Sequence, residues 1–223
     1  MKILLIEDEK SLSDSILSYL REEGHTCELA SDFSSAEMKT GIYGYDCVVV
    51  DITLPGGSGL DIIADLKKKG SEAGIIIISA KNSLDDKVQG LDLGADDYLT
   101  KPFHLSELNS RIKSIIRRRN FKGSNEIVFN EIAIIPEEMQ VTIKKKPVTL
   151  TRKEFDLLLF FVSNKNRVLT KESIAEHLWG DDMDTSDSFD FIYSHIKNLR
   201  KKLIEKGAED YIQTVYGLGY KFG

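Results

Sequence analysis

The chain has 223 residues, of which 41% are hydrophobic and 30% charged, and its formal net charge is −6 at pH 7. This composition supplies enough apolar surface for a folded core and excludes a disordered chain. The apolar runs are far shorter than the roughly 20 residues of a membrane helix, and Glu7, Asp8 and Glu9 stand where a signal peptide needs a long apolar stretch, so we expect a cytoplasmic protein with no membrane partner.

The excess of acidic residues is confined to the first half of the chain. Residues 1–118 hold 14 Lys and Arg against 20 Asp and Glu, whereas residues 119–223 hold 16 of each kind. A polar segment separates the halves, with the sequence Arg, Asn, Phe, Lys, Gly, Ser, Asn over residues 119–125. We therefore predict two modules, 1–118 and 126–223, joined by a linker at 119–125.

The chain contains only two cysteines, Cys27 and Cys47. Their number and spacing support neither a disulfide framework nor a cysteine zinc site. We predict that both are small buried hydrophobic residues.

Short apolar runs alternate with longer amphipathic stretches through the first module. The runs predict five strands, at residues 3–6, 27–30, 47–50, 75–78 and 98–100. The stretches predict five helices, which begin near Ser11, Ser34, Gly59, Leu84 and Leu105. Strands that are apolar throughout are typical of a parallel sheet covered on both faces, so we predict a doubly wound α/β domain with five parallel strands.

Polar residues follow the carboxyl ends of these strands, where ligands bind in such sheets. Glu7 and Asp8 follow the first strand, Asp51 the third, Ser79 the fourth and Lys101 the fifth. Clustered carboxylates suit Mg²⁺, while Lys101 and Ser79 can hold phosphoryl oxygens. The sequence has no glycine-rich dinucleotide fingerprint and no phosphate-binding loop, so neither a dinucleotide nor a nucleoside triphosphate is the expected ligand.

In order and spacing, the first module resembles the receiver domain of bacterial two-component response regulators, and the matching elements are Glu7-Asp8, Asp51, Ser79-Ala80, Tyr98 and Lys101-Pro102. The resemblance implies that Asp51 accepts a phosphoryl group from a sensor histidine kinase. It implies that Mg²⁺ is held by Asp8, Asp51 and the backbone carbonyl of Thr53, with Glu7 acting through a metal-bound water. It also implies a cis peptide bond before Pro102, and a switch in which Ser79 moves toward the phosphoryl group and Tyr98 turns inward.

Each of these residues also has a simpler interpretation. An acid after a strand is often only a helix cap, and Glu7 and Asp8 precede a helix whose N-terminus favours negative charge. Ser79 equally fits an ordinary strand-end hydroxyl, Lys101 a solvated lysine in a turn, and Tyr98 a partly buried core residue. Asp51 is different, because it ends an apolar run and precedes a loop rather than a helix.

The loop after Asp51 departs from the family pattern. It holds three glycines, Gly56, Gly57 and Gly59, where relatives more often carry a bulkier residue. We expect a looser loop and an altered lifetime of the phosphoryl group.

Charged residues in the last part of the module match the positions through which one subfamily forms a two-fold dimer. By this resemblance, the pairs between copies are Lys87 with Glu107, Asp97 with Arg111 and Asp96 with Arg118. Exposed charges on helices are usually solvated and contribute little, but the complementary signs at all of these positions favour the dimer. A two-fold interface would bring two copies of the second module together.

Short strand-like runs open the second module, and we predict an antiparallel sheet from residues 127–129, 132–135, 141–143 and 148–150. A capping box at Thr151 and Glu154 begins one helix, and a second helix runs from Leu169 to Trp179. A third helix carries one apolar stripe, formed by Phe189, Ile192, Ile196, Leu199 and Leu203. Residues 211–222 predict a β-hairpin that turns at residues 217–219.

Three helices closed by a hairpin form a winged helix-turn-helix. The strings at residues 150–155, 195–203 and 217–220 are similar to the effector domain of OmpR/PhoB-type response regulators. The resemblance implies double-stranded DNA as a partner, with the third helix in the major groove and the hairpin on the adjacent minor groove or backbone. The candidate DNA contacts are Ser194, Lys197, Asn198, Arg200, Lys201 and Tyr216.

Two residues of this module depart from the family, because Asp190 and Tyr216 stand where relatives carry arginine. We therefore expect altered specificity, fewer phosphate contacts and a dependence of DNA binding on dimerisation. The basic residues of the third helix also fit an ordinary last turn favoured by the helix dipole.

Three functions remain open at this point. The first is a transcriptional regulator switched by phosphorylation, not an enzyme, with the loop at residues 180–187 as a candidate contact for RNA polymerase. The second keeps DNA binding but makes the first module a constitutive dimerisation module. The intact residues of the pocket argue against it, namely Asp8, Asp51, Ser79 and Lys101. The third is a phosphohydrolase with Asp51 as covalent nucleophile, which lacks an acid two residues on because Thr53 stands there.

Overall fold

The computed structural model describes residues 1–81, 84–121, 125–180 and 190–223. The chain divides into two compact units, Met1–Arg119 and Asn120–Gly223. Helix α5 (Leu105–Phe121) runs across this boundary, so it includes the first residues of the segment 119–125 that the sequence assigns to a linker. The guanidinium of Arg119 donates to Asp96 at 2.8 Å, which anchors the last turns of the helix. Residues 122–124 of the predicted linker lie outside the described residues.

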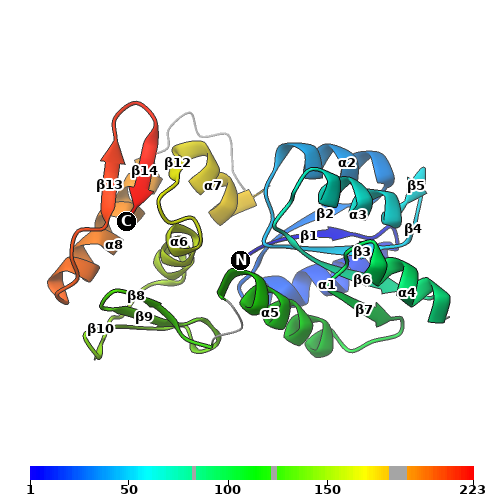
Figure 1. Ribbon diagram of the computed structural model, residues 1–223, viewed down its shortest axis with the longest axis horizontal. Coiled ribbons are helices and arrows are strands. Elements are labelled where there is room, and N and C mark those ends of the chain that lie inside the picture. Colours follow the sequence, from blue (N-terminus) through cyan, green and yellow to red (C-terminus); the bar gives the residue numbers. More distant parts are fainter. Residues whose placement is uncertain (82–83, 122–124, 181–189) are drawn as a thin grey trace. The chain divides into compact units, whose positions relative to one another are not determined.

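A five-stranded parallel sheet forms the middle layer of the first unit (Figure 1). Its strands stand in the order β2 (Thr26–Ala30), β1 (Lys2–Ile6), β3 (Cys47–Asp51), β6 (Gly74–Ser79) and β7 (Asp97–Thr100). Every neighbouring pair is parallel, and every residue of β1, β3 and β6 is buried. The predicted doubly wound α/β architecture is confirmed.

Helices cover both faces of this sheet. Figure 1 shows α2 (Phe33–Ile42) and α3 (Gly59–Lys68) on one side, and α1 (Lys10–Glu22) and α5 on the other. Helix α4 (Leu84–Asp92) precedes the edge strand β7. None of the helices in the described ranges combines the length and the apolar character that crossing a bilayer requires.

A short hairpin that the sequence does not predict follows β3. It pairs β4 (Thr53–Leu54) with β5 (Gly57–Ser58). Strands of two residues are too short to leave a periodic signal. The paired strands of the hairpin fix the backbone of the loop that follows Asp51.

The described part of the second unit contains an antiparallel sheet, three α-helices and a second antiparallel sheet. The first sheet has the order β11 (Lys146–Pro147), β10 (Gln140–Ile143), β9 (Ile132–Ile135) and β8 (Ile127–Phe129), with a 3-10 helix, η1 (Pro136–Glu138), between β9 and β10. The helices are α6 (Arg152–Ser163), α7 (Lys171–Trp179) and α8 (Asp190–Glu205). The second sheet has the order β12 (Val168–Thr170), β14 (Gly219–Phe222) and β13 (Ile212–Val215).

Two expectations for the second unit are wrong in detail. The predicted strand at 148–150 is replaced by β11, because Lys144 and Lys145 both have positive φ (49° and 65°) and form a two-residue hairpin turn. The expected helix start at Leu169 is instead strand β12, which pairs with β14, and Thr170 caps α7. Pairing with a strand so distant in the chain leaves no local signal in the sequence.

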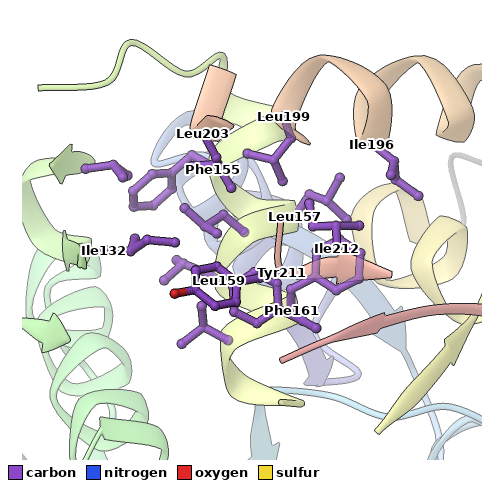
Figure 2. Packing of buried hydrophobic residues seen from close by; sticks show 14 of the residues in the cluster. Ile132, Phe155, Leu157, Leu159, Phe161, Ile196, Leu199, Leu203, Tyr211 and Ile212 are labelled. Atoms are coloured by element: carbon purple, nitrogen blue, oxygen red, sulfur yellow. The ribbon is translucent and has the colours of Figure 1, made fainter. Parts of the chain in front are cut away.

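The core of the second unit forms around α6 (Figure 2). Figure 2 shows Leu157 and Phe161 of α6 packed among residues of α8 and of β13. The predicted stripe of α8 is buried at Ile192, Ile196, Leu199 and Leu203, while Phe189 lies outside the described residues. The predicted capping box at the start of α6 is also confirmed, since Glu154 accepts from the backbone N–H of Thr151 at 2.7 Å.

Both cysteines are buried, as predicted. Burial raises the pKa of Cys27 to about 12 and raises the pKa of Cys47 beyond the usual thiol range. At pH 8 the thiolate of Cys27 is therefore about one ten-thousandth of the total, and both sulfurs are shielded from reagents.

We predict that neither thiol reacts with Ellman's reagent at pH 8 in the folded protein, because only an accessible thiolate is nucleophilic. Absorbance of the released thionitrobenzoate measures this directly. The same protein in guanidinium chloride is the control and should release two equivalents. Stoichiometric labelling without denaturant would contradict the burial of β2 and β3.

Candidate functional site

Two carboxylates and one ammonium group meet at the carboxyl edge of the parallel sheet. Glu7 follows β1 and Asp51 ends β3, and these strands are neighbours, so the two side chains leave the sheet side by side. Lys101 follows the edge strand β7, and its Nζ donates to Oδ2 of Asp51 at 2.6 Å and to Oε2 of Glu7 at 2.7 Å. Asp51 and Glu7 are only 6% and 1% exposed. Lys101 is therefore the counter-ion of a buried acidic pair.

The ionisation of the pocket follows from burial and from this ion pair. Burial raises the pKa of Glu7, and it outweighs the hydrogen bond and positive charge of Lys101, which act in the opposite direction. Burial lowers the pKa of Lys101, but the hydrogen bonds to Asp51 and Glu7 outweigh it, so this pKa lies above its usual value. Lys101 thus carries its charge at neutral pH.

A third carboxylate completes an acidic cluster. Ligand oxygens of Glu7, Asp8 and Asp51 all lie within 4.8 Å of one another, and Asp8 is exposed. Oxygen donors at this spacing, open to water on one side, fit a hard cation that keeps part of its hydration shell. Thr53 is also at the pocket, because its backbone N–H donates to Oδ1 of Asp51 at 3.0 Å.

Ser79 ends β6, and Tyr98 lies within the neighbouring strand β7. Ser79 is 1% exposed and its Oγ accepts from the backbone N–H of Lys81 at 3.1 Å. The hydroxyl of Tyr98, whose pKa is raised by burial, donates to the carbonyl of the same Lys81 at 2.9 Å. Both residues therefore contact one short segment after β6. The peptide bond between Lys101 and Pro102 is cis.

One glycine of the exposed loop after Asp51 lies against an aromatic ring. A Cβ added to Gly57 would stand 2.5 Å from the ring of Phe33, at the start of α2. The ring covers the β4–β5 hairpin so closely that only glycine fits at this position. Gly57 thus permits a close contact with the ring of Phe33.

Four of the six charged residues assigned to a dimer interface form ion pairs within one chain. Arg111 donates to Asp97 at 2.7 Å and to Glu107 at 2.7 Å. Asp96 pairs with Arg119 rather than with Arg118, which is exposed. Sequence reasoning missed Arg119, and α5 continues far enough to bring it to Asp96.

Helix α4 also exposes large apolar residues. Leu84 is 75% exposed, Val88 46% and Leu91 44%. They lie one helical turn apart, so α4 presents an apolar ridge. Lys87 lies on the same helix and is partly buried.

Not every residue of α8 that the sequence predicts as a DNA contact is fully exposed on the outer face of the helix. Ser194, Lys197, Asn198 and Lys201 are exposed, as expected for contact residues. Arg200 is turned to Asp210, to which it donates from both Nε, at 2.7 Å, and Nη2. The side chain of Asp190 lies outside the described residues. Sequence reasoning missed the Asp210 partner, because that residue follows α8 in a separate segment.

Lys202, a basic residue next to the predicted DNA contacts of α8, also forms an ion pair within its own unit. Its Nζ donates to Oε2 of Glu154 at 2.6 Å, and Glu154 is 2% exposed. This bond ties α8 to the first turn of α6. In contrast, Tyr216 is 94% exposed in the turn of the β13–β14 hairpin.

Comparison with known proteins finds two family matches. Residues 3–113 match the family described as response regulator receiver domain. Residues 145–222 match the family described as transcriptional regulatory protein, C terminal. The matches fall one in each compact unit.

Relatives that span the whole chain carry the same arrangement. The chain is 37% identical to the transcriptional regulatory protein CiaR of Streptococcus pneumoniae, over 99% of this chain and 97% of the relative. It is also 37% identical to the transcriptional regulatory protein QseB of Escherichia coli O157:H7, over 100% of this chain and 99% of the relative. Among solved structures, the receiver domain of Francisella response regulator 1452 is similar, with a TM-score of 0.51, 33% identity and coverage of 52% of this chain and 97% of that one.

We predict that Lys101→Met lowers the free energy of unfolding of the first unit by about 3 kcal/mol, because it leaves Asp51 and Glu7 as adjacent buried carboxylates without their counter-ion. Calorimetry of the full-length protein measures the change. Combining Lys101→Met with Asp51→Asn should recover part of the loss.

The exposed Lys10→Met is the matched control, since Lys10 lies at the pocket end of α1 with its side chain 87% exposed, and it should change stability by less than about 0.5 kcal/mol. Equal effects of the two lysine substitutions would contradict the counter-ion role of Lys101.

Proposed function

This chain belongs to the response regulators of the OmpR/PhoB type, which are transcriptional regulators and not enzymes, and we propose that phosphorylation of Asp51 controls its binding to DNA. The observation that carries the proposal is the position of Asp51, buried at the end of β3 with the Lys101 ammonium 2.6 Å from its carboxylate. A receiver domain implies a sensor histidine kinase as partner, and the C-terminal domain implies double-stranded DNA. We place the protein in the cytoplasm because both partners act there.

Phosphoryl transfer to Asp51 is an in-line displacement. An oxygen of the carboxylate attacks the phosphorus of a phosphohistidine, the P–O bond forms as the P–N bond breaks, and the leaving imidazole takes up a proton. Such transfer is governed by positioning and by stabilisation of charge on the phosphoryl oxygens. Lys101 supplies a fixed positive charge at the acceptor, and the N–H of Thr53 holds the other carboxylate oxygen.

Mg²⁺ fits the acidic cluster as the second source of positive charge. Asp8 and Asp51 would bind it directly with the carbonyl of Thr53, and Glu7 would bind through a water, as the resemblance to receiver domains implies. When bound, the ion neutralises charge on the phosphoryl oxygens. The exposure of Asp8 leaves room for the waters that Mg²⁺ retains.

The change in charge at Asp51 provides the signal. A phosphoryl group carries about −1.5 to −2 charges, and both the hydroxyl of Ser79 and the ammonium of Lys101 lie at strand ends that can meet it. Movement of Ser79 would disturb the segment at Lys81 that Tyr98 also contacts. We infer that this shared segment couples the pocket to the face formed by α4, β7 and α5.

That face is the proposed site of a two-fold dimer. It combines the apolar ridge of α4 with acids on β7 and bases on α5. The ion pairs of Arg111 within one chain are partly exposed and therefore contribute little, so exchanging them for pairs between copies costs little. Dimerisation would place two copies of α8 on neighbouring half-sites of promoter DNA and raise affinity through bivalency.

The phosphohydrolase alternative is not supported. Thr53 occupies the position where such an enzyme needs an acid or base, and its backbone N–H is committed to Asp51. The relatives are named transcriptional regulators. RNA polymerase stays a candidate partner of the loop at 180–187, most of which lies outside the described residues.

We predict that Mg²⁺ and beryllofluoride, which stands in for the phosphoryl group, convert the wild-type monomer into a dimer, because the added charge at Asp51 stabilises the dimerising state. Light scattering measures the solution mass. Asp51→Asn is the matched variant and should remain monomeric. The same mass in both proteins under all conditions would instead favour a constitutive DNA-binding protein.

The pair of Lys87 with Glu107 permits a charge exchange. We predict that Lys87→Glu and Glu107→Lys each weaken activated dimerisation by more than tenfold, because like charges then oppose one another across the interface. The double variant restores the attraction and should recover most of the affinity in sedimentation equilibrium. If the double variant is as weak as either single one, the two residues do not pair between copies.

A further inference from the structure

The turn of the C-terminal hairpin exposes two large apolar side chains. Tyr216 is 94% exposed and Leu218 is 61% exposed. The turn is closed by a hydrogen bond from the N–H of Leu218 to the carbonyl of Val215 at 3.0 Å. Figure 1 shows this turn at the far end of β13 and β14, beyond the helices of its own unit. We call residues 216–218 the wing tip.

The wing tip stands on a rigid base. A Cβ added to Gly219 would come within 2.0 Å of the carbonyl oxygen of Leu169, so β14 packs directly against the backbone of β12. Tyr220, 5% exposed, makes an edge-to-face contact with Tyr193 of α8, with ring centroids 6.3 Å apart. The hairpin and the exposed face of α8 therefore form one continuous surface with a fixed geometry.

This surface carries few available cations. Two of the bases of α8, Arg200 and Lys202, are bound to Asp210 and Glu154 of the same unit. Lys221 is the only charged residue between Ile212 and Phe222. Attraction to phosphates rests mainly on the exposed Lys197 and on Lys201, which forms a loose, exposed pair with Glu205 at 3.7 Å, so DNA affinity needs a contribution other than charge.

We propose that the wing tip is an apolar wedge, in which Tyr216 and Leu218 enter the minor groove beside the site read by α8 and partly unstack a base step. The inference rests on the proposed DNA-binding function and names the specificity element of that site. Proteins that insert apolar side chains into the minor groove gain contact area at the cost of unstacking. The phenol ring of Tyr216 offers a stacking surface, and Leu218 fills the space beside it.

The wedge favours DNA sequences that deform easily, rather than sequences whose base edges offer particular hydrogen bonds. Pyrimidine–purine steps unstack most easily, so such a step at the flank of each half-site is favoured although no hydrogen bond reads it. A wedge also releases no counter-ions. Its contribution to affinity is therefore insensitive to salt, unlike that of a lysine or arginine.

The test uses the full-length protein with Mg²⁺ and beryllofluoride, and a duplex selected from a random pool by that activated protein. We predict that Tyr216→Ala and Leu218→Ala each weaken binding about tenfold or more, with an unchanged slope of log affinity against log salt. Tyr216→Arg should steepen that slope by about one, since it adds a phosphate contact. 2-Aminopurine at the flanking step should brighten on binding of the wild type and not of Tyr216→Ala.

Val128→Ala is the matched control, because Val128 is 65% exposed on β8, outside the hairpin. It should bind as the wild type does, and the fluorescence of Trp179, the only tryptophan, verifies the fold of each variant. Wild-type affinity of Tyr216→Ala for the duplex overturns the wedge and leaves DNA binding standing. Loss of dimerisation in Tyr216→Ala also overturns it, because the wing tip then covers a second copy. Failure of the wild type to select any duplex overturns both the wedge and the proposed function.

Discussion

The pairing of one lysine with two buried carboxylates organises the first unit. Asp51 and Glu7 end adjacent strands of a parallel sheet, so chain direction alone places their charges together. Without a cation the two would repel each other in a poorly hydrated pocket, and Lys101 supplies that cation from the edge strand. The same arrangement makes the pocket responsive to charge, because any group added to Asp51 must share Lys101 with Glu7. In the proposed mechanism, stability of the resting fold and sensitivity to phosphorylation would thus come from one ion pair.

The charged residues of the second unit are arranged differently. Two of the bases of α8 form ion pairs within the unit, Arg200 with Asp210 and Lys202 with Glu154, and among the described residues Tyr216 is the most exposed large hydrophobic side chain. These ion pairs join α8 to neighbouring segments and hold it in position for reading DNA. They also reduce the charge offered to phosphates. In the proposed dimer, such a unit would rely more on shape and on a second copy than on general attraction to the polyanion.

The face formed by α4, β7 and α5 is stabilised within the monomer and still exposes an apolar surface that a second copy could cover. Arg111 is satisfied by Asp97 and Glu107 of its own chain, so the charged part of the face carries no strong penalty in the monomer. The apolar ridge at Leu84, Val88 and Leu91 remains exposed. In the proposed dimer, burial of that ridge would supply the driving force for association, and the ion pairs would supply its register.

The sequence alone determined the order of the main helices and strands of the first unit, the parallel sheet and the residues of the pocket. An apolar run that ends in Asp51 or Ser79 predicts both a buried strand and the polar residue at its carboxyl end. The same pattern therefore predicted the sheet and the residues of the pocket. The tertiary structure alone decided which charges meet: that Lys101 bridges Asp51 and Glu7, that Arg119 reaches Asp96, and that Asp210 engages Arg200. It also decided that β12 pairs with β14 and that Phe33 packs on Gly57. Local patterns encode local conformation, whereas ion pairs and packing depend on distances between segments that are remote in the chain.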